Sequence, residues 1–487
     1  MRQCGILMHI SSLPGAGGIG TLGQEAFQFA DFLEKAGMKI WQVLPVGPTG
    51  YGNSPYQSSS VFAGDPLLIS TSRLHDEGLL TAETTLTASG DTVDYEAVRK
   101  EKEQLLRACW KESGDKLRSE CETFRRGNAW VEEFALFTVL KSKFGDKAWT
   151  EWPDEGLRMR RRDALDKARN ELKSEIDYQV FVQTLFHRQW VALKRYVNDK
   201  GIRIFGDMPI YVAADSADAW THPEVFQLDK NRRPKRVSGV PPDYFSADGQ
   251  MWGNPLYRWH WLRFHRYGWW VERMRAMGQM YDMIRIDHFI GFANYYSIPF
   301  GAPNARSGKW VVGPGKSLFK VLQKELPDLT IIAEDLGDVN ARVRKLLDWC
   351  GYPGMRVLTF AFGGDEQNPH LPKNYVTNSV AYTGTHDNDT VRGWADTADE
   401  KALAQAKKLL GFEKNEDAAQ AFIRGVMGSR ADTCIVPMQD VLGLDGKARM
   451  NVPGTVGDNW RWRMLQGAAT QELAGSLHVL AKQTNRT

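Results

Sequence analysis

The sequence predicts an α/β protein folded as a (β/α)8 TIM barrel with helical and hairpin insertions between the barrel strands. Eight short apolar runs are candidate strands, and helical patterns separate most of them, which is the alternation that the barrel needs. A doubly wound sheet is the alternative. A glycine-rich phosphate loop would favour that sheet, but no GxGxxG or GxxxxGK(S/T) motif follows any of the runs.

The first elements follow one another at the spacing of a parallel α/β unit. A strand is predicted at 5–10, a helix at 24–36 and a second strand at 39–45, and Gly37 ends the helix. The six other strands are predicted at 202–207, from Met283 onward, and at 330–334, 355–360, 379–383 and 433–438. Further helices are predicted at 178–200, 259–277, 339–349, 400–410 and 417–426.

Two stretches interrupt the alternation of strands and helices. Residues 73–176 consist mainly of charged helical segments and are too long for a βα loop, so they predict a helical insertion subdomain. Its helices are expected at 95–111, 116–126, 130–143 and 161–173. Residues 226–257 are rich in turn residues and predict a hairpin and loop insertion. The chain, 1–487, is expected to form one domain that carries both insertions.

The composition is that of a globular protein without a polyanionic partner. The 487 residues are 42% hydrophobic and 25% charged, with a net charge of +3. We interpret the basic cluster at 158–162 as a solvated helix face, because no aromatic residues interleave it. No apolar run is long enough for a signal peptide or a membrane span. These features predict neither nucleic acid nor membrane as a partner.

The cysteines indicate the compartment. There are five, an odd number, and they form no CxxC pair and match no metal-site spacing. We interpret them as free thiols in a reducing environment, and therefore expect a cytoplasmic protein.

One candidate strand ends on a pair of opposite charges. In the stretch from Met283 to Phe289, Arg285 and Asp287 share one face of the strand, because successive residues alternate faces. Asp287 is a candidate catalytic nucleophile, which Arg285 would hold ionised at neutral pH. A structural ion pair at a strand end is the alternative interpretation.

Two further strands end in acid. Glu334 follows the apolar run 330–333, and Asp387 lies in a polar cluster just after Gly384 ends another strand. Because strand ends converge on one face of a barrel, Asp287, Glu334 and Asp387 are expected to share a pocket.

Three carboxylates in one pocket suit the cleavage of a glycosidic bond with retention. One carboxylate attacks the anomeric carbon, and a carboxylic acid about 5–5.5 Å away protonates the leaving oxygen. Partial desolvation after an apolar run could raise the pKa of Glu334, which fits the acid. A metal site at Asp335, Asp338, Asp387 and Asp389 is the less favoured alternative, because no histidine–carboxylate spacing supports it.

A loop after the second strand is a further candidate for ligand contact. Residues 47–58 are rich in Gly, Pro, Asn and Ser, and Tyr51 and Tyr56 lie among them where no regular structure would bury them. The loop follows the end of a strand where α/β folds place their ligands, so we favour ligand contact for Tyr56.

Several motifs together resemble one known family. The segments 285–288, 334–337 and 386–389 look like the catalytic motifs of the α-amylase clan. The segments 9–14, 50–57, 206–212, 239–243 and 451–455 narrow the resemblance to the amylomaltases, or 4-α-glucanotransferases, of glycoside hydrolase family 77. The resemblance runs from about Gly5 to Leu480, and no N-terminal extension is expected before the first strand.

The resemblance implies a retaining disproportionation of α-1,4-glucans such as maltodextrins and segments derived from starch or glycogen. It implies that Asp287 is the nucleophile, that Glu334 is the acid and base, and that Asp387 binds hydroxyls of the distorted ring. The substrate-binding residues that it implies are Tyr56, Asp207, Arg285, His386, Tyr51, Ser54, Gln250, Trp252 and Asn459. No metal and no organic cofactor are expected.

Two other functions are compatible with the same residues. A hydrolase of the same clan would use identical carboxylates and release sugar to water, with loops such as 244–253 controlling access. A non-catalytic glucan-binding protein would be signalled by loss of a carboxylate, and all three are present.

Overall fold

The computed structural model describes residues 2–84, 90–242, 247–337, 339–412 and 417–487, except for the side chain of Tyr51. Eight parallel strands form one sheet in the order β10-β11-β12-β1-β2-β3-β6-β9, so each strand lies beside its neighbours in the barrel sequence. The Ala333 N–H donates to the Pro353 carbonyl oxygen at 2.9 Å and brings β9 beside β10, which nearly closes the barrel.

All eight predicted strands are confirmed. Their bounds are β1 Gln3–Leu7, β2 Ile40–Gln42, β3 Arg203–Pro209, β6 Met283–Asp287, β9 Ile331–Ala333, β10 Gly354–Val357, β11 Ser379–Tyr382 and β12 Thr433–Pro437. Most of their residues are buried on both faces, as parallel strands covered by helices must be. This is why they read as continuous apolar runs in the sequence.

Helices surround the sheet. Those outside the insertion are α1 Gln24–Lys35, α8 Lys173–Asp199, α9 Ala217–Thr221, α10 Trp259–Phe264, α11 Gly268–Met280, α12 Ile290–Ala293, α13 Lys316–Glu325, α14 Ala341–Cys350, α15 Val391–Thr397, α16 Glu400–Leu410, α17 Ala418–Gly428, α18 Met438–Val441 and α19 Gln471–Gln483. Polar caps set several starts: Asp399, Asp417 and Asn340 each accept a backbone N–H of the first turn.

The single helix predicted at 259–277 is wrong in one respect. The structure divides it into α10 and α11, because Arg266 and Tyr267 both adopt the left-handed region, with φ of 52° and 55°. Two consecutive residues in that region interrupt the helical hydrogen bonds, and no glycine at either position announces the break.

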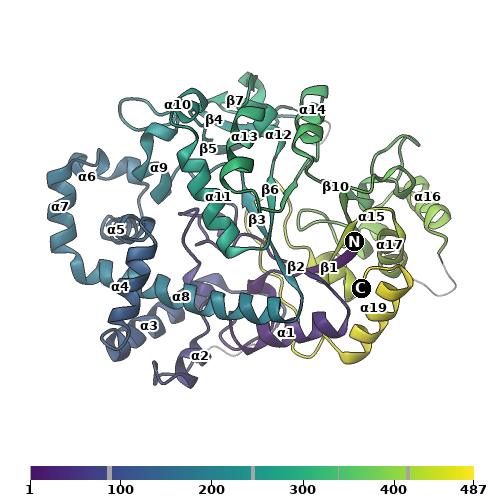
Figure 1. Cartoon of the computed structure of the whole chain (residues 1–487), viewed down its shortest axis with the longest axis horizontal. Coiled ribbons are helices and arrows are strands. Elements are labelled where there is room, and N and C mark those ends of the chain that lie inside the picture. Colours follow the sequence, from purple (N-terminus) through teal and green to yellow (C-terminus); the bar gives the residue numbers. More distant parts are fainter. Residues whose placement is uncertain (1, 85–89, 243–246, 338, 413–416) are drawn as a thin grey trace.

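Between β2 and β3 the chain forms helices α2 Thr71–Asp76, α3 Tyr95–Ser113, α4 Arg118–Gly127, α5 Trp130–Lys143, α6 Glu155–Arg158 and α7 Arg162–Glu171. They gather at one end of the molecule, against α8 (left in Figure 1). The basic cluster is paired internally: Arg160 donates to Glu133 at 2.8 Å and lies 4.2 Å from the Trp220 ring, and Arg161 pairs with Glu155. The prediction of a solvated helix face is therefore wrong: most of the cluster lies on the turn between α6 and α7, where Arg160 is only 17% exposed and its φ is 58°.

A second sheet lies beside the end of the barrel at which the carboxyl ends of the parallel strands meet. Its antiparallel strands are β4 Arg236–Val240, β5 Gln250–Pro255, β7 Asn294–Pro299 and β8 Lys309–Val312, in the order β5-β4-β7-β8. The predicted hairpin region 226–257 supplies β4 and β5. Strands β7 and β8 are not predicted from the sequence. Four of the six β7 residues are buried, so no alternation of polar and apolar residues marks that strand, and β8 is only four residues long.

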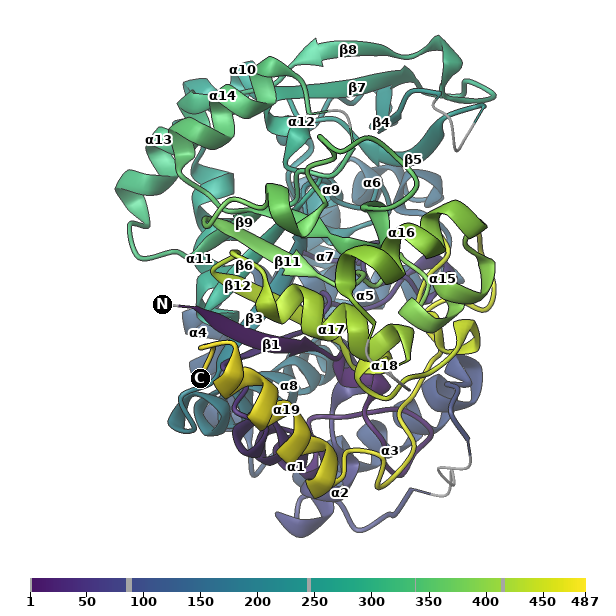
Figure 2. The ribbon, with the colours of Figure 1, turned by 90° about the vertical axis from the view of Figure 1, so that its right-hand side faces the viewer.

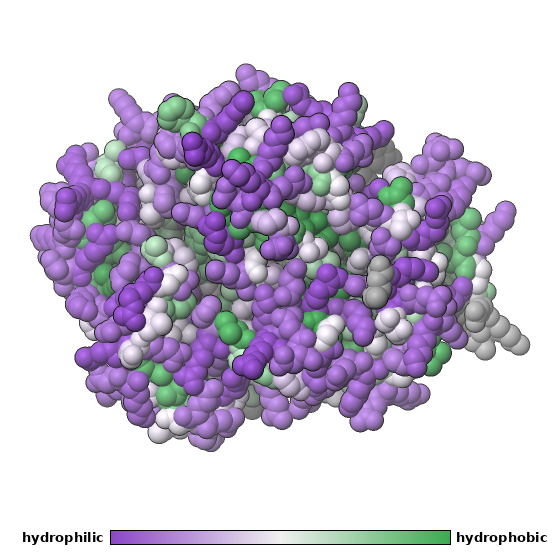
Figure 3. Space-filling model, in the orientation of Figure 1, coloured by the Kyte–Doolittle hydropathy of each residue, from purple (hydrophilic) through white to green (hydrophobic). Residues whose placement is uncertain are grey.

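The surface turned to the viewer in Figure 3 is mainly hydrophilic, with apolar side chains in small separate groups. Among the described residues no helix has both the length and the apolar character needed to cross a bilayer. The five cysteines are buried and unpaired.

The two ends of the chain meet beside β1 (Figure 2). Arg486 is fully buried, and its guanidinium donates to five backbone carbonyls: those of Met427, Ser429, Ala431, Asp432 and Gln3, at 2.7–3.2 Å. The last turn of the chain is therefore fastened to the first strand and to the loop that precedes β12.

Replacing Arg486 with Ala should lower the free energy of unfolding by more than about 3 kcal/mol, because five carbonyls each lose a hydrogen bond from the buried guanidinium. Thermal unfolding measures the effect. Arg195→Ala is the matched control, since Arg195 is 84% exposed and pairs with Asp199 only at 3.9 Å. Equal midpoints for the two variants would contradict the role assigned to Arg486.

Candidate active site

Strands β3 and β6 bring three charged residues together at one end of the barrel. They are parallel neighbours in which Asp207 lies beside Arg285. The Arg285 guanidinium donates to Asp207 Oδ2 at 2.9 Å and to Asp287 Oδ1 at 3.0 Å. The side chains of Arg285 and Asp207 are 3% and 0% exposed. The prediction that Arg285 and Asp287 share a face is confirmed, and Asp207 joins them.

Two loops extend this network across the barrel mouth. Tyr56, from the loop after β2, donates its hydroxyl proton to Asp207 Oδ2 at 2.6 Å. Its ring stacks on His386, with centroids 5.1 Å apart and planes 12° apart. His386 Nε2 lies 3.4 Å from Asp387 Oδ1. Residues more than 300 positions apart in sequence therefore meet through Tyr56.

Glu334 follows β9, the strand next to β6. Its two carboxyl oxygens accept backbone N–H groups, Oε2 from His288 at 2.6 Å and Oε1 from Leu336 at 2.7 Å. Burial raises the pKa of Glu334, and the neighbouring charge of Asp287 raises it further; Arg285 and the two N–H bonds act in the opposite direction. The predicted raised pKa of the acid agrees with this environment.

Asp287 has an environment of opposing influences. Burial raises its pKa, Arg285 lowers it, and Asp207 and Asp387 raise it again. Arg285 thus acts in the predicted direction, but it does not outweigh burial and the two nearby carboxylates. Asp287 and Glu334 interact, so their protons are lost in steps that belong to the pair. The ion pair with Arg285 favours Asp287 as the member that ionises first.

The other residues expected in the site have more local contacts. Ser54 Oγ accepts the Tyr56 N–H at 3.3 Å and shapes that loop. Trp252 Nε1 donates to Gln250 Oε1 at 3.1 Å within β5. Asn459 accepts the N–H of Val452 at 2.9 Å and so braces its own loop.

Parts of the expected site are outside the described residues. These are the Tyr51 side chain, residues 244–246 of the loop expected to control access, and Asp338. Asp335 accepts the Met355 N–H at 2.6 Å and pairs with Arg356 at 3.4 Å. Within the described part of the chain, no three or more His, Cys, Asp and Glu side chains lie together in a way that could hold a metal ion.

Two residues that the sequence analysis did not select hold Asp387. Asn451 Nδ2 donates to Asp387 Oδ1 at 2.6 Å, and Arg449 Nη2 donates to the Asp387 carbonyl at 2.7 Å. Arg449 Nε also donates to the Asn451 carbonyl at 2.8 Å, which ties the two residues together. Asn451 begins the motif 451–455, which is visible in the sequence, but the sequence does not show that Asn451 bonds Asp387.

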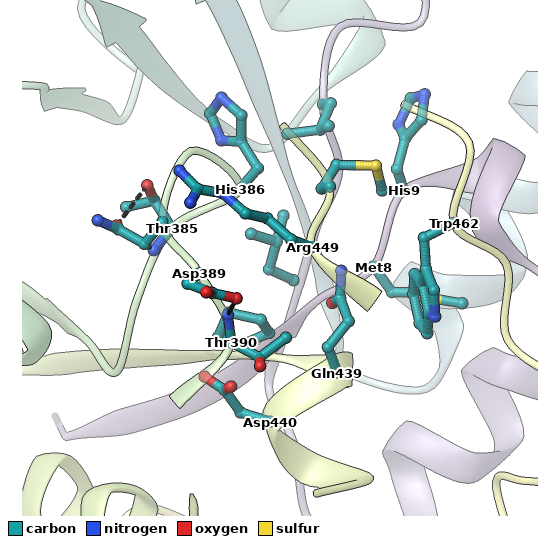
Figure 4. A pocket seen from close by; sticks show the side chains of 15 residues that line it. Met8, His9, Thr385, His386, Asp389, Thr390, Gln439, Asp440, Arg449 and Trp462 are labelled. Atoms are coloured by element: carbon teal, nitrogen blue, oxygen red, sulfur yellow. Dashed lines mark hydrogen bonds between the residues drawn. The ribbon is translucent and has the colours of Figure 1, made fainter. Parts of the chain in front are cut away.

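Arg449 crosses a polar pocket behind His386. In Figure 4 its side chain points toward the loop that carries Thr385 and His386, while His9 lies on the opposite wall. Burial lowers the pKa of His9 to about 3, so this imidazole is neutral at ordinary pH. The wall beside His386 is therefore uncharged where His9 forms it.

The fold and the strand-end carboxylates define a class, the (β/α)8 enzymes that act on glycosidic bonds through carboxyl groups. Comparison with known proteins narrows it. The sequence model of the 4-alpha-glucanotransferase family matches residues 8–468. A 4-alpha-glucanotransferase of Clostridium butyricum is 43% identical over 98% of this chain and 99% of its own length. One from Thermus thermophilus is 44% identical over 100% of this chain and 99% of its own.

A solved structure agrees with the sequence relatives. An amylomaltase from Streptococcus agalactiae in complex with acarbose superposes with a TM-score of 0.97 at 40% identity, and each chain is covered to 100%. The chain belongs to the 4-alpha-glucanotransferase family and is an enzyme of that family. The resemblance found in the sequence and the barrel fold are confirmed.

Replacing Asn451 with Ala should reduce turnover in glucan transfer about 10–100-fold, because the Asp387 carboxylate loses a charge-assisted hydrogen bond worth about 1.5–3 kcal/mol. Steady-state kcat and KM measure the loss. Val452→Ala, at an exposed neighbour in the same segment, is the control. If both variants keep wild-type turnover, Asn451 does not hold Asp387 for catalysis.

Proposed function

We propose that the chain transfers α-1,4-glucan segments between maltodextrin donors and acceptors through a covalent glycosyl-enzyme on Asp287. One observation carries this: Asp287 and Glu334 end neighbouring strands, and the residue after Asp287 donates its N–H to Glu334 at 2.6 Å. Two carboxyl groups this closely linked, one of them paired with arginine, suit the retaining reaction. The full-length similarity to 4-alpha-glucanotransferases supports the choice of substrate.

In the first step Asp287 attacks the anomeric carbon of the donor. Arg285 binds Oδ1, so we assign the attack to Oδ2. A bond forms between Oδ2 and the anomeric carbon while the bond from that carbon to the glycosidic oxygen breaks. Glu334 gives its proton to the departing oxygen, and the shortened glucan leaves with a free 4-hydroxyl.

In the second step the 4-hydroxyl of an acceptor glucan attacks the same carbon from the opposite side. Glu334, now a carboxylate, takes the proton of that hydroxyl, and Asp287 is released. Two inversions restore the α configuration. If water took the place of the acceptor, the same residues would perform hydrolysis.

The surrounding residues bind the sugar ring that reacts. Asp387 and His386 are proposed to bind its hydroxyls, while Tyr56, Asp207 and Arg285 support the same subsite. The other residues proposed to line the groove are Tyr51, Ser54, Gln250, Trp252 and Asn459. We also propose that 1–487 acts as one catalytic domain, with 226–257 beside the site and 73–176 as a peripheral helical insertion.

Incubation of the purified protein with maltotriose tests the proposal. Glucose should appear together with a ladder of longer maltodextrins, because acceptors compete successfully with water for the intermediate. Glucose and maltose without longer products would identify a hydrolase. An unchanged maltotriose pool would indicate a binding protein without activity.

Asp287→Asn and Glu334→Gln should each keep the native unfolding temperature and lose several orders of magnitude in turnover; a hundredfold loss already corresponds to about 2.7 kcal/mol of transition-state stabilisation.

Donor kcat/KM of the wild type should fall toward acid as Asp287 is protonated. It should fall toward alkali as Glu334, with its raised pKa, loses its proton. Glu334→Gln should lack the alkaline limb. Wild-type turnover in either variant would refute the assignment.

A further inference from the structure

The residue after the proposed nucleophile has an unusual backbone. His288 is not glycine, yet its φ is 52°, in the left-handed region that costs an L-residue roughly 1–2 kcal/mol. Strain of this kind persists only where the surrounding structure holds it, and it concentrates at functional sites. His288 therefore needs a structural reason for its conformation.

Hydrogen bonds from the strained turn end on Glu334. The His288 N–H donates to Glu334 Oε2 at 2.6 Å, and the Phe289 N–H donates to the Glu334 carbonyl at 3.1 Å. In return the Glu334 N–H donates to the Ile286 carbonyl at 3.0 Å. The left-handed turn thus fixes both the backbone and one carboxyl oxygen of Glu334.

The imidazole ring keeps this turn in place. It is buried, with Trp252 of β5 edge-on at 4.8 Å and 90° and with Tyr211 at 6.4 Å. Gly291 leaves the space that the ring occupies, since a Cβ there would lie 3.2 Å from His288 Cδ2. The ring is thus enclosed by a strand of the second sheet and by the chain that follows β6.

The ring itself does not fit the role of a proton carrier. His288 Nε2 is buried and has no hydrogen-bond partner among the described residues. Burial also lowers the pKa of His288 to about 4, so the imidazole is neutral at ordinary pH. The ring therefore acts through its packing, as a flat aromatic group between Trp252 and the turn.

We propose that His288 is a positioning residue, whose ring, packed on Trp252, holds the left-handed turn that aims and fixes the Glu334 carboxyl. This rests on the proposed function of Glu334 as acid and base. The proposal also links the second sheet to the reaction. Trp252 of β5 packs against the His288 ring, and the His288 N–H binds Glu334. A displacement of about 1 Å at a catalytic group can cost about 100-fold in rate.

The test compares donors that differ in their need for an acid. The departing sugar of maltotriose must be protonated, whereas the fluoride of α-maltotriosyl fluoride leaves as an anion. His288→Ala should reduce kcat/KM by about 10–100-fold for maltotriose and by less than about threefold for the fluoride. A general structural defect would reduce both values alike, so equal losses would overturn the proposal.

A double-mutant cycle isolates the path through Glu334. In a Glu334→Ala background, where Oε2 is absent, His288→Ala should have no further effect on the reaction of the fluoride or of maltotriose. A further loss as large as in the wild type would mean that His288 acts elsewhere. Wild-type activity of Glu334→Ala itself on maltotriose would instead refute the proposed function, so the two failures are distinguishable.

Conservative variants separate the ring from its nitrogen. His288→Phe should regain most of the maltotriose activity lost in His288→Ala, because it restores a ring against Trp252. His288→Asn, which tolerates the left-handed region but lacks the ring, should behave as His288→Ala and provides the test if the Ala variant does not fold. Failure of His288→Phe to regain activity while Tm matches the wild type would assign the effect to the nitrogen and overturn the proposal.

The contact has a second side that can be varied. In Trp252→Leu any lost groove contact should lower kcat/KM for both donors alike, and the loss of His288 packing should add a further decrease for maltotriose alone. Trp310→Leu, on the opposite edge strand of the same sheet, should not show this difference between donors. An equal response to both substitutions would remove Trp252 from the proposal.

Discussion

The Arg285 guanidinium is the interaction on which the rest of the site depends. It lies almost fully buried between Asp207 and Asp287 and also donates to the Tyr56 hydroxyl at 3.2 Å. Two carboxylates at adjacent strand ends would repel each other in a medium of low dielectric, and a cation between them offsets that cost only with close geometry. The hydrogen bonds of Arg285 therefore fix the position of the Asp207 carboxylate and the orientation of the Asp287 carboxylate. Through Tyr56 it also fixes the loop that reaches His386 and Asp387.

The barrel could be predicted because its signals are local. Buried parallel strands such as β6 and β9 are continuous apolar runs, and the acids that end them mark the polar face. The same convergence of strand ends predicts from the sequence that Asp287, Glu334 and Asp387 lie in one pocket. The match of α16 to its predicted bounds has a similar origin, since Asp399 caps it and Gly411 ends it.

The remaining features depend on contacts between distant segments. The strand β7 carries no alternation because it is buried on both sides, and the break between α10 and α11 occurs without glycine. Asn451 and Arg449 lie 62 or more positions from Asp387, so their hydrogen bonds have no trace in the sequence. His288 was visible as part of a motif, but its left-handed backbone and its neutral, enclosed ring are properties of the packed structure.

Strand β1 pairs with β12, and Arg486 fastens β1 and the loop that precedes β12 to the last turn of the chain. The ribosome therefore synthesises β1 long before β12, its neighbour in the sheet. At roughly 5–20 residues per second, β1 waits on the order of 20–90 s for its second neighbour. During that interval one edge of β1 has unpaired N–H and C=O groups, and buried residues such as Ile6 lack part of their cover. Until β12 is made, this edge of the nascent chain is open to chaperone binding and to aggregation.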